Sequence, residues 1–184
     1  QQGSLDEELR KRSADALIDI GFDGYAVGGL AVGEGQEAMF GCLDYAPDQL
    51  PADRPRYLMG VGKPDDLVGA VERGIDMFDC VMPSRNARHG MLFTWEGTIN
   101  IKNLKWADDF SPIDENSKVW VDQVYTKAYL RHLIKAQEYL GIQIATIHNL
   151  AFYLELVEQA RQHIKAGDFL SWKNTMVKQL SQRR

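Results

Sequence analysis

One aspartate stands where a reactive carboxylate would be useful. Asp79 closes a short apolar run that begins at Ile75, and Cys80 follows it. An aspartate at the end of a strand can act as a nucleophile or as a general base. A lone aspartate in such a place is more often a cap or an ion-pair partner, and Cys80 is typical of a buried apolar residue. Asp79 is the first candidate for chemistry.

Two glycine-containing turns follow other apolar runs. Gly28-Gly29-Leu30-Ala31 comes directly after Tyr25–Val27, and Met59-Gly60 closes the run that begins at Tyr57. Glycine lets the backbone approach a flat ligand closely and exposes N–H and C=O groups that can hydrogen-bond its edge. The alternative is that both segments are simply turns. A site for a planar ligand is the functional interpretation.

Basic residues occur near the same turns. Lys63 follows the second apolar run, and Arg85, Arg88 and His89 follow Asp79 within residues 83–90. Phosphate contacts position a nucleic acid without being the point of reaction. Basic groups around an acidic centre therefore suit a polyanionic substrate that reacts elsewhere than at phosphate. The alternative is a solvated loop with scattered charge.

These residues must be positioned by alternating helices and strands. Ser4 and Glu7 form the pattern of a capping box at the start of a first helix, and Gly21 closes that helix. Apolar spacing and the glycine and proline positions then predict strands at 25–27, 57–59 and 75–79 and helices at 36–43 and 64–73. Such alternation favours parallel strands with crossover helices, and three of these units make about half of an eight-stranded (β/α) barrel.

The pattern changes after Pro83. Residues 91–103 alternate around Glu96-Gly97, which predicts a β-hairpin, and the chain is mostly helical from Val124 onward. We therefore expect an α/β half barrel at 1–90, with the nucleophile and base-binding loops. A hairpin and a mostly helical subdomain should follow at 91–184.

Composition narrows the class of protein. The 184 residues carry a formal net charge of -5, which argues weakly against nucleic acid unless a local basic patch exists. Two cysteines, Cys42 and Cys80, are too few for a disulfide framework and favour a reduced, cytoplasmic setting. No apolar run approaches the roughly 20 residues of a membrane span, so no membrane partner is expected. The polar, acidic N-terminus shows no signal peptide. Because the sequence lacks an initiator Met and Gln1 opens in the middle of a motif, we expect a chain cut from something longer.

Several long motifs, in order and in register, resemble the bacterial tRNA-guanine transglycosylase family. The likeness runs from Gln1 to about Leu180. The motifs that carry it are Gln1–Ser4, Gly21–Glu34, Tyr57–Pro64 and Gly74–Val81.

The resemblance implies base exchange at the wobble position of certain tRNAs, as part of queuosine biosynthesis. An aspartate of the family attacks ribose C1′, expels guanine and leaves a covalent intermediate, which a 7-deazaguanine base such as preQ1 then displaces. Asp79 matches this catalytic nucleophile. Positions that bind the base match Gln2, Gly29, Leu30, Ala31, Val32, Met59 and Gly60, and positions around the tRNA anticodon loop match Lys63, Arg85 and Arg88. Val32 points to preQ1, because relatives that accept bulkier queuine tend to have glycine there.

The chain departs from the family at its structural zinc site. The family binds zinc through three cysteines and a histidine, whereas this sequence has Ser117, Val119, Asp122 and His148 at those positions. One histidine and one aspartate cannot make the usual thiolate-rich tetrahedral site. We expect no bound metal and no other cofactor, with apolar packing around Val119 and Val121 in place of zinc and His148 as a core or capping histidine.

The resemblance covers only the C-terminal half of the family. The missing half would supply the first barrel strands, an aspartate acting as general acid or base and a further base-binding aspartate. Open sheet edges would remain, so we expect the isolated chain to be inactive or impaired. Its expected partners are tRNA, the guanine or preQ1 base, and either a complementary N-terminal half or a second copy, since the family commonly dimerises near its zinc site. The alternative is a non-catalytic interaction or tRNA-binding remnant of the fold.

Overall fold

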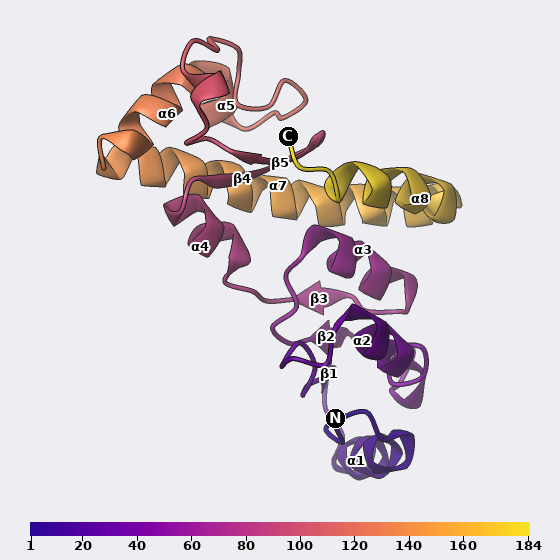
Figure 1. Cartoon of the computed structure of the whole chain (residues 1–184). Helices are drawn as coiled ribbons and strands as arrows, with labels where there is room; N and C mark the ends of the chain where they lie inside the picture. Colours follow the sequence, from indigo (N-terminus) through magenta and orange to yellow (C-terminus); the bar gives the residue numbers. More distant parts are fainter. The chain divides into compact units, whose positions relative to one another are not determined.

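The computed structural model describes residues 1–184 and divides them into two compact units (Figure 1). The first is Gln1–Val81 and the second is Met82–Arg184. Residues 82–90, which the sequence analysis groups with the strands, therefore belong to the helical unit. There they pack against its long helix and its hairpin.

The first unit is a small parallel α/β fold. Its three strands lie in the order β1-β2-β3, with Ala26 opposite Tyr57 and Leu58 opposite Phe78, and both strand pairs are parallel. The alternation expected from the sequence is thus confirmed as a mixed α/β fold. Its elements are α1 (Glu7–Ile20), β1 (Tyr25–Val27), α2 (Gln36–Leu43), the 3-10 turn η1 (Pro47–Gln49), β2 (Arg56–Leu58), α3 (Pro64–Glu72) and β3 (Met77–Phe78).

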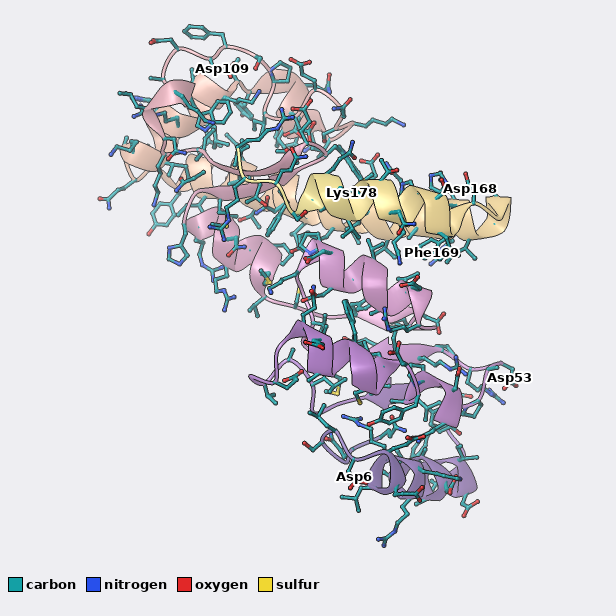
Figure 2. All side chains as sticks on the ribbon, turned by 45° about the vertical axis from the view of Figure 1, so that its right-hand side comes forward. Asp6, Asp53, Asp109, Asp168, Phe169 and Lys178 are labelled. Carbon is teal, nitrogen blue, oxygen red and sulfur yellow. The ribbon has the colours of Figure 1, made fainter.

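The expected capping box at Ser4 is wrong. A cap at Ser4 would start the helix at Leu5, but helix α1 begins at Glu7. Its N-cap is Asp6, whose carboxylate accepts a hydrogen bond from the Leu9 N–H at 2.9 Å. Figure 2 labels Asp6 at this end of the helix. Aspartate is as good an N-cap as serine, and Ser4 instead adopts a positive φ of 53° in the preceding turn.

The core of the first unit lies between the sheet and its helices. Val27 and Leu58 on the strands are fully buried, as are Ala14 of α1 and Ala70 of α3. Strands of two or three residues supply little area for packing, so the helices provide most of the apolar surface. Their burial fixes the strands and hence the turns that follow them.

The second unit is built on one long helix. Its elements are α4 (Met82–Arg88), β4 (Met91–Thr94), β5 (Gly97–Asn100), the 3-10 turn η2 (Leu104–Trp106), α5 (Trp120–Val124), α6 (Lys127–Lys135), α7 (Tyr139–Ala166) and α8 (Phe169–Leu180). The expected hairpin is confirmed, with Leu92 opposite Ile99 in an antiparallel pair. Gly167 ends α7 in the left-handed conformation, and α8 then folds back along it from the turn labelled by Asp168 and Phe169 in Figure 2.

Helix α7 is the core helix of this unit. By length and composition alone its 28 residues could cross a membrane, as core helices of soluble proteins often could. Its buried face, however, carries polar side chains that are hydrogen-bonded inside the unit. Asn149 accepts from the Phe93 N–H at 3.1 Å and donates to the carbonyls of Pro83 and Met91 at 2.9 and 3.0 Å. One asparagine thus ties α7 to both β4 and α4.

Candidate functional site

The candidate site lies at the carboxyl ends of the three parallel strands. The turn after β1 begins at Gly28, the turn after β2 at Met59 and the turn after β3 at Asp79. Because β2 pairs with both neighbours in parallel, all three turns leave the sheet at the same edge. This is where open and closed parallel α/β folds bind their ligands.

Asp79 is exposed at this edge and does not point into the core. Its Oδ1 accepts a hydrogen bond from the Gly60 N–H at 3.1 Å, which joins the ends of β3 and β2. Tyr57 is its second neighbour. Partial desolvation raises the pKa of the Tyr57 hydroxyl, and the hydrogen bond and negative charge of Asp79 raise it further. Asp79 is therefore an exposed carboxylate that Gly60 and Tyr57 hold in one orientation.

The first turn is close to the N-terminal segment. A Cβ on Gly28 would lie 2.5 Å from the Gln2 Nε2 atom, and one on Gly29 would lie 2.7 Å from the Gln2 Oε1 atom. A side chain at either position would displace the Gln2 amide, and the φ of 69° at Gly29 in addition favours glycine there. The Met59 sulfur lies 3.4 Å from the same Gly28 Cβ position. The amide of Gln2, the Gly28-Gly29 turn and Met59 thus form one continuous surface.

A glutamate that the sequence analysis did not select organises the loop beyond Leu30. Glu34 accepts from the N–H groups of Ala31 and Val32, the latter at 2.9 Å. Partial desolvation alone would raise the pKa of Glu34, but hydrogen bonds from backbone N–H groups outweigh it and lower that pKa. Ala31 has a positive φ of 58°, and Val32 is 82% exposed. The position of Glu34 between Gly33 and Gly35, in a segment rich in turn residues, is the sequence signal that could have identified it.

The structure brings most of the sequence-selected residues into the first unit. Eight of them are exposed there: Gln2, Gly29, Ala31, Val32, Met59, Gly60, Lys63 and Asp79. The Leu30 side chain is buried, so only its backbone could contact a ligand. Lys63 stands at the N-cap of α3. Arg85 and Arg88 are exposed on α4, which belongs to the second unit.

The four positions matching the family's zinc ligands do not fit a metal. The Nδ1 atom of His148 lies 2.8 Å from Asp122 Oδ2, and its Nε2 donates to the Phe93 carbonyl at 2.8 Å, so protein groups already engage both ring nitrogens. The side chains of His148 and Asp122 are 1% and 0% exposed. Nowhere in the chain do three His, Cys, Asp or Glu side chains come together in a way that could hold a metal ion.

The other two positions have different surroundings. The Ser117 hydroxyl accepts from the Val119 N–H at 3.3 Å, and Val119 packs against the apolar core together with fully buried Val121. A valine side chain offers no lone pair to a metal. This segment is held by packing and by the Asp122–His148 pair.

The fold and this edge define an α/β protein that presents an exposed carboxylate beside a glycine-lined surface. The family model for queuine tRNA-ribosyltransferase matches residues 1–182. Among similar proteins, the queuine tRNA-ribosyltransferase of Sphingopyxis alaskensis is 61% identical over 174 residues, which is 95% of this chain and 46% of that protein. Those of Novosphingobium aromaticivorans and Zymomonas mobilis are 62% and 58% identical over 94% and 92% of this chain.

This chain belongs to the queuine tRNA-ribosyltransferase family, as the motifs of the sequence indicated. It spans about half the length of the curated relatives it matches, covering 46% and 44% of the Novosphingobium and Zymomonas proteins.

Proposed function

We propose that this chain is the nucleophile-bearing part of a tRNA-guanine transglycosylase, a cytoplasmic enzyme of queuosine biosynthesis. The observation that carries the proposal is the placement of Asp79. It is exposed at the carboxyl edge of the sheet, hydrogen-bonded to Gly60, while the adjoining strand ends present Met59 and the Gly28-Gly29 turn with Gln2. A carboxylate next to a surface for a purine is what base exchange requires.

In the proposed reaction the Asp79 carboxylate attacks C1′ of the wobble ribose. The C1′–O bond forms as the bond from C1′ to guanine N9 breaks, and the departing guanine takes the electron pair and a proton from the general acid that the N-terminal half would supply. Carboxylates are suited to trapping such cation-like sugars. N9 of the incoming base then attacks C1′ and gives its proton to the same group of the N-terminal half, now acting as the base, and the Asp79 carboxylate leaves. The base has to be flipped out of its stack for either step.

The incoming base is proposed to be preQ1. Gln2 and the Gly29 backbone would hydrogen-bond the purine edge, the Leu30 carbonyl would face the aminomethyl group, and Met59 and Gly60 would pack on the ring. Ala31 and Val32 would border the pocket, and the Val32 side chain, which is exposed in this loop, would exclude a bulkier base. Lys63, Arg85 and Arg88, all exposed, would contact phosphates of the anticodon loop.

The partner needed for activity is proposed to be an N-terminal half of the kind the relatives carry. In the parallel sheet β1-β2-β3, the edge strands β1 and β3 each pair with one strand only, and the outer edge of β1 is bonded to Gln1 through the Ala26 carbonyl and the Gly28 N–H. Completion by further strands would turn it into a (β/α) barrel of eight strands. The added half would also bring the general acid or base for the departing guanine.

Self-association is proposed to involve the aromatic residues next to Asp122. Trp120 and Tyr129 are 55% and 43% exposed, and Tyr125 lies between them, with its ring centroid 5.8 Å from that of Tyr129. Exposed large aromatic side chains in one cluster are typical of protein interfaces.

The fold of the second unit is proposed to need no zinc. The buried Asp122–His148 pair would do the work of the metal by joining α5 to α7 and, through the Phe93 carbonyl, to β4.

The test is exchange of labelled guanine into tRNA, with and without the N-terminal half of the Sphingopyxis relative supplied separately. We expect exchange when that half is present and its loss in Asp79→Asn. The matched control is Asp53→Asn. Asp53 is an exposed aspartate between η1 and β2, at the outside of the first unit (Figure 2). Tight tRNA binding without exchange under any condition would instead favour a non-catalytic tRNA-binding remnant.

A further inference from the structure

Helix α1 contains an arginine that is completely buried. Arg10 has a relative exposure of 0%, although arginine is among the residues least often buried. Its Nε donates to the Ser4 carbonyl at 2.6 Å and its Nη2 to the Gly28 carbonyl at 3.0 Å. The remaining nitrogen, Nη1, is buried without a hydrogen-bond partner. Both acceptors of this cation are therefore neutral backbone groups.

Burying a guanidinium opposite neutral carbonyls is costly. Desolvation of a charged group amounts to several kcal/mol, and a full ion pair is needed to offset most of it. The charge of Arg10 is even felt by its neighbours, because desolvation first and the Arg10 charge second lower the pKa of the Gln1 ammonium. An apolar side chain at this position would be buried without that desolvation cost. What Arg10 supplies is the direction of the two carbonyls it holds.

The Gly28 carbonyl matters because it belongs to the peptide group that ends in the Gly29 N–H. In a planar trans peptide the C=O and the N–H point in opposite directions. Holding the Gly28 carbonyl toward buried Arg10 therefore turns the Gly29 N–H away from it, and Gly29 is exposed whereas Gly28 is buried. A glycine peptide has no side chain to prevent it from turning over, so an external hydrogen bond has to fix it.

The second carbonyl belongs to the segment that carries Gln2. Arg10 fixes the chain at Ser4, the Gln1 carbonyl accepts from the Gly28 N–H at 3.1 Å, and Ser13 of α1 accepts from the Gln2 N–H at 3.1 Å. The Gln2 side chain then lies against Gly28 and Gly29. One guanidinium thus connects both chain segments that present groups to the base.

We propose that Arg10 is a positioning residue for base recognition, which sets the directions of the Gly29 N–H and the Gln2 amide without touching the base. The inference rests on the proposed function of this site. It predicts that loss of the guanidinium weakens the binding of the base more than the binding of tRNA.

The experiment uses the chain together with the N-terminal half of the Sphingopyxis relative and compares Arg10→Met, Arg10→Lys and Arg12→Met. Methionine keeps the length and removes the donors, lysine keeps the charge with a different geometry, and Arg12 is the exposed control on the same helix. A hydrogen bond to a charged group corresponds to about tenfold or more in binding. We expect the KM for guanine to rise about tenfold in Arg10→Met, less in Arg10→Lys and not at all in Arg12→Met.

The KM for tRNA and the rate per active site, counted by the trapped tRNA adduct, should stay close to wild type in all three variants. An unchanged KM for guanine in a folded Arg10 variant would overturn the inference and make Arg10 merely structural. If Arg10→Met does not fold, as judged by circular dichroism, the same comparison for Arg10→Lys decides. A wild-type protein without exchange would overturn the proposed function together with this inference, whereas wild-type exchange with an unchanged KM for guanine in the Arg10 variants would overturn this inference alone.

Discussion

At the scale of single residues, the site depends on carboxylates whose oxygens accept backbone N–H groups. Asp79 accepts from Gly60, and Glu34 accepts from Ala31 and Val32. Each bond fixes a turn that has no regular secondary structure of its own. The carboxylates therefore determine the shape of the surface as well as its charge.

Glu34→Gln should loosen the loop that follows Leu30. The amide side chain can offer only one acceptor oxygen where the carboxylate offers two, and it lacks the charge that strengthens such bonds. We expect hydrogen exchange of the Ala31 and Val32 amides to become several-fold faster, with little change in the exchange of β1. Exchange measured by NMR or mass spectrometry tests this, and unchanged protection in the variant would contradict it.

The same loop should respond to acid. The folded-state pKa of Glu34 lies below the ordinary value of 4.5, so its stabilisation of the loop is fully present above about pH 4.5. It should be lost as the pH falls through the lowered pKa, when the carboxyl group becomes protonated. Below that pH, the amide protection of Val32 in the wild-type protein should therefore fall to its value in Glu34→Gln. A difference that persists in the fully protonated state would argue against this assignment.

The residues of the candidate site are easier to identify from the sequence than the residues that hold them in place. Asp79 and the glycine turns stand at strand ends that apolar runs and glycines make visible. Arg10 and Glu34 could not be found in that way, because their importance lies in distant carbonyls and in loop geometry that only the fold brings together. Asp6 was missed as a cap because Ser4 and Glu7 matched a common pattern.

At the scale of elements, the hairpin and most helices of the second unit were predictable and α4 was not. The sequence pattern assigns no element to residues 83–90 and gives a solvated loop only as an alternative, although Pro83 near a helix start and Gly90 after its end are signals of a short helix. Its seven residues are too few to show periodicity. The helix is held by tertiary contacts, above all the bond from Asn149 of α7 to the Pro83 carbonyl.

The Asp122–His148 pair is predicted to hold α5 on α7 without metal. Removing one partner of a buried pair leaves the other charged or unsatisfied, which costs about 3–5 kcal/mol. Asp122→Ala should therefore lower the free energy of unfolding by about that amount, measured by denaturant titration of the whole chain. Asp108→Ala, an exposed aspartate of the same unit, should change it by less than about 0.5 kcal/mol. Equal effects of the two substitutions would contradict the assignment.

The stability of the wild-type chain should also be indifferent to chelators. We expect no change in the unfolding midpoint on addition of EDTA. The combined variant Ser117→Cys, Val119→Cys and Asp122→Cys should instead bind about one zinc per chain and become sensitive to EDTA, because three thiolates and His148 complete a tetrahedral site. Finding about one zinc per wild-type chain by metal analysis would refute the metal-free interpretation.

At the scale of the whole molecule, the chain is two compact units, and the chemistry proposed for it needs further partners. The parallel sheet of the first unit ends in edge strands, and the aromatic cluster of the second unit is exposed. Neither partner can be deduced from local sequence patterns, because edges and interfaces are made by strands and surfaces outside this chain. The resemblance to a family of about twice this length, together with 46% coverage of its members, supplied that information.

Tyr129→Ser is predicted to weaken self-association. Tyr129 is exposed on α6 and stacks on Tyr125. Its substitution therefore removes aromatic contact area from the proposed interface and leaves the packing of the core unchanged. Light scattering after size exclusion should show a fall in apparent mass at micromolar concentration, whereas Tyr139→Ser, an exposed tyrosine at the start of α7, should leave the mass unchanged. A wild-type protein that is monomeric at every concentration would refute the interface.

The most direct test of the proposed function is to trap and map the bond between protein and tRNA. The chain, supplied with the N-terminal half of a relative, is incubated with tRNA and denatured, and the cross-linked peptide is identified by mass spectrometry. The account predicts a denaturation-resistant adduct on Asp79 that forms with tRNA alone, is discharged by preQ1 and is absent from Asp79→Asn. Base exchange that persists in Asp79→Asn, or an adduct mapped to any other residue, would contradict it.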